Sequence, residues 1–363
     1  MWHDQGNNAG VLPATFPVQP GRPYEAPETK RRLKNLLDAC GMSDQLVNIP
    51  AQEATIQELL RTHSAEYLDR LQHLNEVGGP AGMDAPVTPG SYDIARLAAG
   101  GCIAAVDAIL DGRIANAYAL VRPPGHHAEA DTGKGFCLLN NGAIAAKHAL
   151  EAGDVERVAI VDWDVHHGNG VQKIFWDDPA VLTISIHQEL TFPPDSGGLD
   201  ETGADSARGT NINIPLPPGS GWGAYEAAFQ RVVIPAVRAF QPGLIIVASG
   251  YDAGFHDPLG RMLLHSGAFR HMTEMILEIA NVCCDGRILV THEGGYSEAN
   301  VPFDALAVFE ALSGIDSGVK DPFLDIFQPY PWQALQGHQE QVIAAAEKTL
   351  KLLAELPASG RTR

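Results

Sequence analysis

Apolar residues along this chain gather in short, β-branched runs. Each run is followed by Gly-rich or polar residues and then by a stretch with helical spacing. Strands covered by helices on both faces read as such continuous apolar runs, so the alternation is typical of a mainly parallel sheet wrapped by helices. We therefore predict an α/β fold whose clearest strands are residues 117–121, 158–161, 181–186, 244–247 and 288–291.

No internal repeat or break in composition divides the chain, which predicts a single domain over residues 1–363. Residues 1–26 differ from the rest, because prolines disfavour a helix there, whereas Pro27 suits the first turn of a helix that runs to about Cys40. We expect residues 1–26 to form a loop or arm that packs on the body or on a second subunit of a homo-oligomer. The other predicted helices are residues 91–110, 142–152, 225–240, 269–283 and one near 339–356, within a C-terminal helix and tail at 337–363.

The composition narrows the class of protein. Of the 363 residues, 45% are hydrophobic and 19% are charged, and no apolar run reaches the length of a bilayer span. The N-terminus also lacks the basic and apolar regions of a secretory signal, so we expect a globular, cytoplasmic protein with no role in a membrane. Five cysteines without a CxxC spacing fit reduced thiols, so a bound metal has to be held by histidine and carboxylate.

The formal net charge of −19 bears on the partner. Binding to DNA or RNA is driven by Lys and Arg side chains that neutralise phosphates, so this charge argues against a nucleic-acid partner. The charge suits a cationic substrate, although acidity also keeps many cytoplasmic proteins in solution.

Ionisable residues concentrate directly after four of the predicted strands. In open α/β sheets ligands bind beyond the carboxyl ends of the strands, so residues at these positions meet at one edge. The segments are RPPGHH at residues 122–127, DWDVHHGNG at 162–170, SGYD at 249–252 and HEGGY at 292–296.

The second of these segments has the composition of a metal site. Side chains of an extended chain alternate between faces, so Asp162, Asp164 and His166 point the same way and bring two carboxylates and an imidazole together. Crowded carboxylates repel each other unless a cation neutralises them. Asp252, from another strand end, completes a set of three protein ligands, which leaves a position for water as in a catalytic zinc site.

The other strand-end residues suit hydrolysis of an amide. Zinc lowers the pKa of bound water to about 7, His126 and His127 can move protons, and Tyr296 can donate a hydrogen bond to an oxyanion. Each feature alone has a plainer explanation, namely a structural His pair, a capped turn at a strand end, and a tyrosine packed in a turn. Their location at strand ends of one face favours an active site.

Five segments resemble the histone deacetylase superfamily, and more closely its class II and bacterial histone deacetylase-like amidohydrolase branch. They are RPPGHHA (122–128), GKGFCLLNN (133–141), VDWDVHHGNG (161–170), SGYDAGFHDPLG (249–260) and HEGGYSEA (292–299), in the family's order. The resemblance covers roughly residues 24–320 and implies an arginase-like, three-layer α/β/α fold with a central, mainly parallel eight-stranded sheet.

The resemblance implies two kinds of bound ion. Asp164, His166 and Asp252 match the family's ligands for a single zinc ion, although iron(II) or cobalt(II) also suits two carboxylates and an imidazole. Family members further bind a structural potassium ion beneath the zinc. Its oxygen ligands here would come from Asp162, Asp164, His166, Ser185 and Ile186.

The resemblance also implies catalytic roles. His127 matches the general base and acid, and His126 matches its partner imidazole, which Asp162 would hydrogen-bond. Asn169 takes the position that orients the other histidine, which is Asp in class I members and Asn in class II. Tyr296 matches the catalytic tyrosine, in the form associated with strong deacetylation.

A narrow substrate tunnel is the third implication. Phe136 and Phe192 match the two aromatic walls that grip the acyl-lysine stem, with Gly135 beside them. A methylene chain gains apolar burial between such rings. Leu259 would sit on the rim, and Asp84 resembles a rim aspartate that accepts hydrogen bonds from the substrate backbone.

Several alternatives stay open. Arginase-type ureohydrolases share the fold but hold two manganese ions with additional aspartates, whereas residues 251–257 show one well-placed carboxylate. A protein that only binds acyl-lysine would have a damaged catalytic set, and no damage is visible. The substrate is an acylated lysine, an acylated polyamine or another small amide. Family members also begin with a short β-strand before the segment that matches Trp2-His3, and this chain starts after it.

Overall fold

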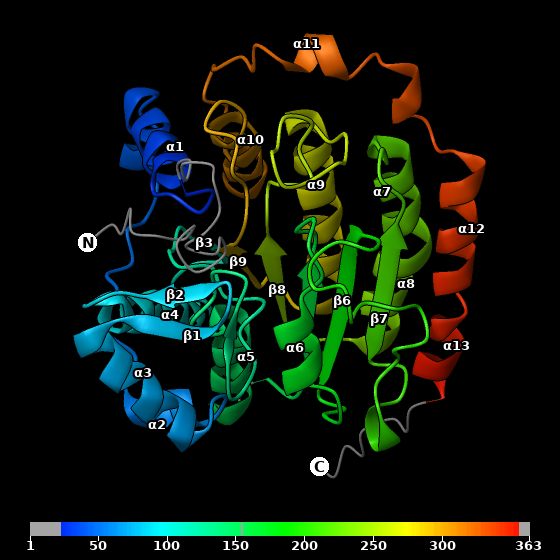
Figure 1. Cartoon of the computed structure of the whole chain (residues 1–363). Helices are drawn as coiled ribbons and strands as arrows, with labels where there is room; N and C mark the ends of the chain where they lie inside the picture. Colours follow the sequence, from blue (N-terminus) through cyan, green and yellow to red (C-terminus); the bar gives the residue numbers. More distant parts are fainter. Residues whose placement is uncertain (1–22, 154, 356–363) are drawn as a thin grey trace, which may run out of the picture.

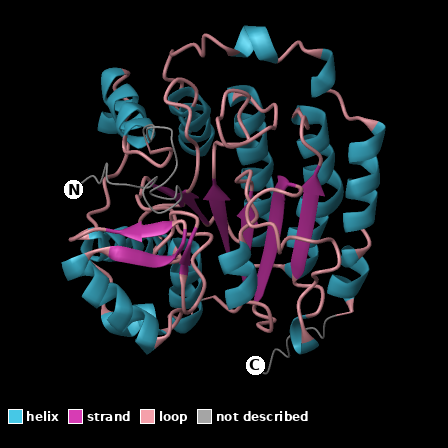
Figure 2. Ribbon diagram, in the orientation of Figure 1, coloured by secondary structure: helices cyan, strands magenta, loops and turns pink. Residues whose placement is uncertain are grey.

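The central sheet has six parallel strands in the order β3–β9–β8–β5–β6–β7 (Figures 1 and 2). The computed structural model describes residues 23–153 and 155–355, so most of the predicted N-terminal arm and the end of the tail lie outside the described residues. All five predicted strands are present. The bounds are Asn116–Ala119 (β3), Val158–Asp162 (β5), Val181–Gln188 (β6), Asn211–Leu216 (β7), Leu244–Ser249 (β8) and Ile288–His292 (β9).

Strand β7 was not predicted, because its sequence NINIPL is not a continuous apolar run. It pairs only with β6 and forms an edge of the sheet, where a proline is tolerated. Its two asparagines, Asn211 and Asn213, are buried and donate to the side-chain oxygen of Gln172. Polar contacts with Gln172 of α6 therefore take the place of apolar packing on this face of β7.

Helices cover both faces of the sheet, which confirms the predicted three-layer α/β/α architecture. In β5, Ala159 and Val161 pack into one core, and Val158 and Ile160 pack into the other. The first core receives α1 (Glu28–Ala39), α7 (Trp222–Ala228), α8 (Ile234–Phe240), α9 (Ser266–Cys283), α10 (Val301–Ser313), α12 (Gly337–Ala346) and α13 (Thr349–Ala354). The second receives α4 (Ser91–Leu110), α5 (Asn141–Glu151) and α6 (Asn169–Ile174).

The expected central sheet had eight strands, whereas the observed one has six in the described part of the chain. Three further strands form a separate small sheet in the order β2–β1–β4. They are β1 (Gly79–Met83), β2 (Ala85–Val87) and β4 (Gly133–Lys134). A third core beneath them receives α2 (Ile56–Leu60) and α3 (Ala65–Val77). Pro80 lacks an N–H donor, and a Cβ at Gly82 would lie 1.9 Å from the carbonyl oxygen of Gly133. Such a strand suits a short, close-packed ribbon better than the middle of a large sheet.

Two predicted helices are interrupted. The helix expected at 225–240 consists of α7, a π-helical turn η3 (Phe229–Val233) and α8. Pro235 is the second residue of α8. Proline cannot donate the helical hydrogen bond at this point. The helix expected near 339–356 is divided into α12 and α13, whereas the helix after Pro27 is confirmed as α1. The short remaining elements are η1 (Ser43–Gln45), η2 (Asp205–Ala207), α11 (Leu324–Phe327) and η4 (Pro331–Gln333). Within the described ranges, no helix combines the length and apolar character needed to cross a bilayer.

The strand register gathers the strand ends that carry the candidate chemistry. Asp162, the last residue of β5, is level with Ser185 of β6 and Ala248 of β8, and Ser249 is level with His292 of β9. From β5 the chain proceeds to β6 and β7 on one side and later returns to β8 and β9 on the other. Between β5 and β8 the strand order therefore reverses, which is where open α/β sheets bind ligands.

Candidate active site

Three buried side chains from two neighbouring strand ends form a compact group. Asp164 and His166 follow β5, and Asp252 follows β8. The Nδ1 atom of His166 lies 3.1 Å from Oδ1 of Asp164 and 3.1 Å from Oδ2 of Asp252. Ligands held about 2.0–2.1 Å from a tetrahedral zinc ion lie roughly 3.3 Å apart, so this donor set fits a single zinc ion.

Backbone N–H groups orient both carboxylates of this group. Gly294 donates to Oδ2 of Asp164 at 2.8 Å, and Val165 donates to Oδ1 of Asp252 at 2.8 Å. Hydrogen bonds of this kind hold metal ligands in a fixed orientation. The donor set is therefore preorganised by the ends of β5 and β9.

Asp162 is not part of the group, which corrects the prediction drawn from an extended chain. The strand ends at Asp162, and the backbone then turns, because Oδ1 of Asp162 accepts from N of Asp164 at 3.0 Å and Oδ1 of Asp164 accepts from N of His166 at 2.9 Å. The second oxygen of Asp162 lies 2.9 Å from Nδ1 of His126. Asp162 therefore contacts a histidine, in the place that the family resemblance implied.

The two histidines lie side by side, with the ring centroids of His126 and His127 3.9 Å apart. Nδ1 of His127 lies 2.8 Å from Oδ1 of Asn169, whose Nδ2 donates to Oε1 of Glu129 at 2.8 Å. Because the amide nitrogen of Asn169 faces a carboxylate, its oxygen faces His127, and Nδ1 of His127 carries the proton. The other ring nitrogen of His127 is then an acceptor.

Burial and neighbouring charges act differently on the two histidines. Burial lowers the pKa of His127 well below its ordinary value, and His126 and His166 lower it further. Burial also lowers the pKa of His126, but Asp164 and Asp162 outweigh it, and the pKa rises to about 10. The two pKa values are shifted in opposite directions, so His127 is better suited than His126 to accept a proton.

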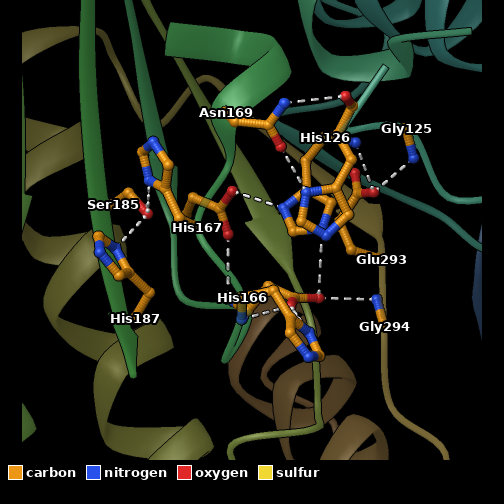
Figure 3. Close-up of polar contacts among 12 residues, drawn as sticks. Gly125, His126, His166, His167, Asn169, Ser185, His187, Glu293 and Gly294 are labelled. Atoms are coloured by element: carbon orange, nitrogen blue, oxygen red, sulfur yellow. Dashed lines mark hydrogen bonds and ion pairs between the residues drawn. The ribbon is translucent and has the colours of Figure 1, made fainter. Parts of the chain in front are cut away.

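Glu293 is a buried residue of the site to which we assigned no role from the sequence. Its Oε2 accepts hydrogen bonds from the backbone N of Gly125 at 2.6 Å and of His126 at 3.1 Å (Figure 3). Its Oε1 accepts from the hydroxyl of Thr291 at 2.7 Å. The carboxylate thus joins the end of β9 to the segment that carries the histidine pair. A single acidic residue inside HEGGY was the only signal for it in the sequence.

A cavity of about 320 Å³ reaches these residues. The candidate catalytic residues His127 and Tyr296 line it together with the ligand His166. All five predicted tunnel residues line it as well, whereas two further lining residues were not predicted. The predicted residues are Asp84, Gly135, Phe136, Phe192 and Leu259, and the others are Tyr24 and Thr191.

Aromatic rings and one glycine shape the cavity walls. The Phe192 ring meets the His127 ring edge-on at a centroid distance of 4.9 Å, and Phe136 meets Tyr296 at 5.9 Å. Gly135 has φ +50°, and a Cβ there would lie 2.4 Å from Cδ2 of His127 and 2.7 Å from Cε1 of Phe192. Only glycine fits at this position, because a side chain would collide with both rings.

Tyr24 lines the cavity, and the ion pair of the next residue, Glu25, holds it there. The guanidinium group of Arg122 donates to both carboxylate oxygens of Glu25, at 2.9 Å and 2.6 Å. A bidentate pair of this kind fixes orientation as well as distance. The pair ties the segment before α1 to the end of β3, and Tyr24 is thereby placed at the cavity, 52% exposed.

Tyr296 carries its proton under ordinary conditions. Burial raises the pKa of its phenol well above the usual value, and Asp252 and Asp164 raise it further. The phenol is therefore available as a hydrogen-bond donor in the wall of the cavity.

The predicted potassium site stays a prediction. Asp162 and Ser185 are neighbours in the strand register. The hydroxyl of Ser185, however, lies 3.2 Å from Nδ1 of His167 and 2.9 Å from Nδ1 of His187 (Figure 3). A potassium ion here would depend on backbone carbonyl oxygens as well as on these side chains.

Known proteins resemble this chain over most of its length. The profile of the histone deacetylase domain matches residues 24–312. A histone deacetylase-like amidohydrolase of Pseudomonas aeruginosa is 51% identical over 336 residues, which are 91% of this chain and 88% of the relative. A probable deacetylase of Archaeoglobus fulgidus is 38% identical over 303 residues, 82% of this chain and 84% of the relative.

A solved structure shares the fold. The crystal structure of the HDA15 HD domain superposes with a TM-score of 0.84 at 34% sequence identity, covering 94% of this chain and 92% of that domain. Relatives named deacetylases and amidohydrolases support hydrolase activity for this chain. The chain therefore belongs to the histone deacetylase superfamily and is similar to its bacterial amidohydrolase-like members.

Proposed function

We propose that this protein is a zinc-dependent amidohydrolase that removes the acyl group from an acylated lysine side chain. The lining of the cavity carries the proposal. Two aromatic rings, Phe136 and Phe192, line it together with the polar residues His127, His166 and Tyr296. A linear methylene stem would bury apolar surface between the two rings and present its amide to the polar residues.

The residues of the site suit each part of the hydrolysis. A zinc ion bound by Asp164, His166 and Asp252 would polarise the amide carbonyl and activate water. His127 takes the proton of the attacking water and returns it to the nitrogen of the leaving amine. Tyr296 donates a hydrogen bond to the oxygen on which negative charge develops.

The donor set favours one metal ion over a two-manganese centre. A second metal would need further carboxylates near Asp252, and Asp257 is the nearest acidic residue along the chain. Asp257 does not belong to the group of Asp164, His166 and Asp252, whose possible ligand atoms all lie within 4.8 Å of one another. Metal analysis should therefore find one ion per chain, and two manganese ions would refute this interpretation.

The mouth of the cavity favours a peptide over a polyamine. Asp84 is the one carboxylate among the lining residues in the described part of the chain. Met83 and Leu190, next in sequence to the lining residues Asp84 and Thr191, are 59% and 93% exposed. An acylated polyamine carries additional positive charges that would need more carboxylates, whereas the residues around an acyl-lysine can cover apolar surface.

The test compares hydrolysis of an acetyl-lysine peptide and of N-acetylputrescine by the zinc-loaded protein and by Tyr296→Phe. We expect peptide turnover, with kcat reduced about 100- to 1000-fold in the variant, as for loss of one oxyanion donor. Turnover of the small amine alone would assign the protein to polyamine chemistry. Binding of acylated peptide without turnover by either protein would indicate a binding protein.

A further inference from the structure

The loop between β8 and α9 carries two parts of the site. Asp252 of the candidate zinc ligands lies near its start, and Leu259 of the cavity wall lies near its middle. Between them lies Asp257, which is 7% exposed. The proposed chemistry gives this buried carboxylate no role.

The Asp257 carboxylate accepts hydrogen bonds from two separate backbone segments. Its Oδ2 accepts from N of Tyr296 at 2.7 Å. Its Oδ1 accepts from N of Leu259 at 2.8 Å and from N of Gly260 at 3.3 Å. Asp257 thus connects Leu259 in the cavity wall to the candidate oxyanion donor, which lies 39 residues further along the sequence than Asp257.

The backbone before Tyr296 needs such an anchor. A Cβ at Gly294 would lie 2.2 Å from Oδ2 of Asp252, and Gly295 has φ +122°. Glycine is required because the chain passes so close to the ligand carboxylates and turns through a conformation that other residues avoid. Gly294 is held on both sides, because its N–H donates to Oδ2 of Asp164 and its carbonyl accepts from N of Tyr251. Beyond Gly295, the contact that holds the backbone of Tyr296 is the one from its N–H to Asp257.

We propose that Asp257 is a positioning residue of the reaction, which holds Tyr296 and Leu259 in place in the wall of the cavity. The inference rests on the role proposed above for Tyr296. Asp257 does not touch the substrate and acts through the backbone of the tyrosine. A displacement of a catalytic group by about 1 Å can lower a rate by about 100-fold.

Asp257→Asn tests the inference with a side chain of the same shape. The amide nitrogen of Asn is a donor, and it would face a backbone N–H on one of the two sides. We expect kcat for the acetyl-lysine peptide to fall about 10- to 100-fold, with a smaller change in KM. In the Tyr296→Phe background, the same substitution should change kcat by less than about twofold, because the hydroxyl that Asp257 positions has been removed. An effect through Leu259 would appear in KM.

Asp321→Asn is the matched control. Asp321 accepts a hydrogen bond from the backbone N of Phe323 at 2.8 Å, two residues further on, as Asp257 does from Leu259. Asp321 lies outside the cavity, so its variant should keep the kcat of the natural protein. Equal losses in the two variants, or an undiminished loss from Asp257→Asn in the Tyr296→Phe background, would overturn the inference.

A measurement independent of turnover reports the position of the tyrosine. The chain has eight tyrosines, and in protein labelled with 3-fluorotyrosine the fluorine NMR signal that is missing from Tyr296→Phe belongs to Tyr296. We expect this signal to move in Asp257→Asn and to stay in place in Asp321→Asn. An unmoved signal contradicts the anchor whatever the activity. A moved signal in a natural protein that hydrolyses neither substrate supports the anchor and refutes the proposed function.

Asp257→Ser serves if the Asn variant fails to fold. A serine hydroxyl can accept one backbone hydrogen bond, so we expect a displacement of the Tyr296 signal and a loss of kcat smaller than that of Asp257→Ala. Equal behaviour of the Ser and Ala variants and the natural protein would refute the inference.

Discussion

Asn169 accepts a hydrogen bond from Nδ1 of His127 at 2.8 Å, and its amide nitrogen donates to the carboxylate of Glu129 at the same distance. The two contacts together fix the orientation of the amide and the tautomer of the histidine. The identity of residue 169 is therefore tied to Glu129, which also lies 2.7 Å from the amine of Lys173.

This relationship predicts that replacing Asn169 by Asp lowers both the stability and the activity of this protein. Asn169→Asp would place a carboxylate against Glu129, and like charges in a buried site repel. We expect the free energy of unfolding to fall by about 1–3 kcal/mol, with lower kcat. Adding Glu129→Gln provides a donor toward the introduced carboxylate and should recover most of the stability. Chemical denaturation of the four proteins of this cycle measures the coupling, and additive effects would contradict it.

Gly135 predicts a steric limit of the cavity. Gly135→Ala would push a methyl group into the rings of His127 and Phe192, so we expect kcat/KM for the peptide to fall by about 100-fold or more. Gly112→Ala is the control, because Gly112 also has a positive φ of +69° but has no atom within 4 Å of the added Cβ. It should cost about 1–2 kcal/mol of stability and leave kcat/KM unchanged. Similar kcat/KM values for Gly135→Ala and Gly112→Ala would contradict the prediction, because the rings of His127 and Phe192 would then be able to move away from the added methyl group.

Zinc binding should stabilise the protein through the predicted ligands. At a free zinc concentration of 100 times Kd, binding to the folded state contributes about 2.7 kcal/mol, so Tm should rise when zinc is added after chelation. Asp252→Asn should lose most of this rise. Cys137→Ser is the control, because Cys137 belongs to a second buried group, with His126 and Glu293, whose geometry could also hold a metal. A rise that persists in Asp252→Asn and disappears in Cys137→Ser would move the zinc to that group.

Asp304 predicts a dependence of stability on pH. This residue of α10 is 1% exposed, and its carboxyl oxygens have no hydrogen-bond partner among the described residues. Burial raises the pKa of Asp304 well above its ordinary value, and Asp321 and Asp257 raise it further. The folded state therefore keeps a proton that the unfolded chain releases above about pH 4, so this group lowers stability as pH rises from there.

Asp304→Asn removes this titration and should raise Tm at pH 8 by a few degrees, with a difference that shrinks as the pH approaches 4. Asp44→Asn, at an exposed position, controls for the change in net charge. Thermal unfolding across this pH range measures the difference. A difference in Tm between Asp304→Asn and the natural protein that stays constant across this pH range would contradict the prediction, because the carboxyl would then not titrate differently in the folded and unfolded states.

The sequence determined the fold class and most residues of the cavity. Five apolar runs correspond to β3, β5, β6, β8 and β9, because strands that are buried on both faces have to be apolar along their whole length. The residues that follow them are brought to one edge by the parallel arrangement itself, so the candidate zinc ligands, the histidine pair and Tyr296 can be predicted from the sequence. Edge strand β7 was missed because burial there is achieved by a polar network.

The groups that hold these residues in place come from distant parts of the chain and cannot be identified from the local sequence. The turn after β5 took Asp162 away from the ligands and toward His126. Glu293 reaches the histidine segment across 168 residues, and Asp257 reaches Tyr296 across 39. Such contacts leave little trace in the local pattern, because a buried backbone N–H can be satisfied by any acceptor that the fold brings near. The residue types at the strand ends therefore indicate the chemistry of the site, whereas its geometry depends on hydrogen bonds between segments that meet only when the chain is folded.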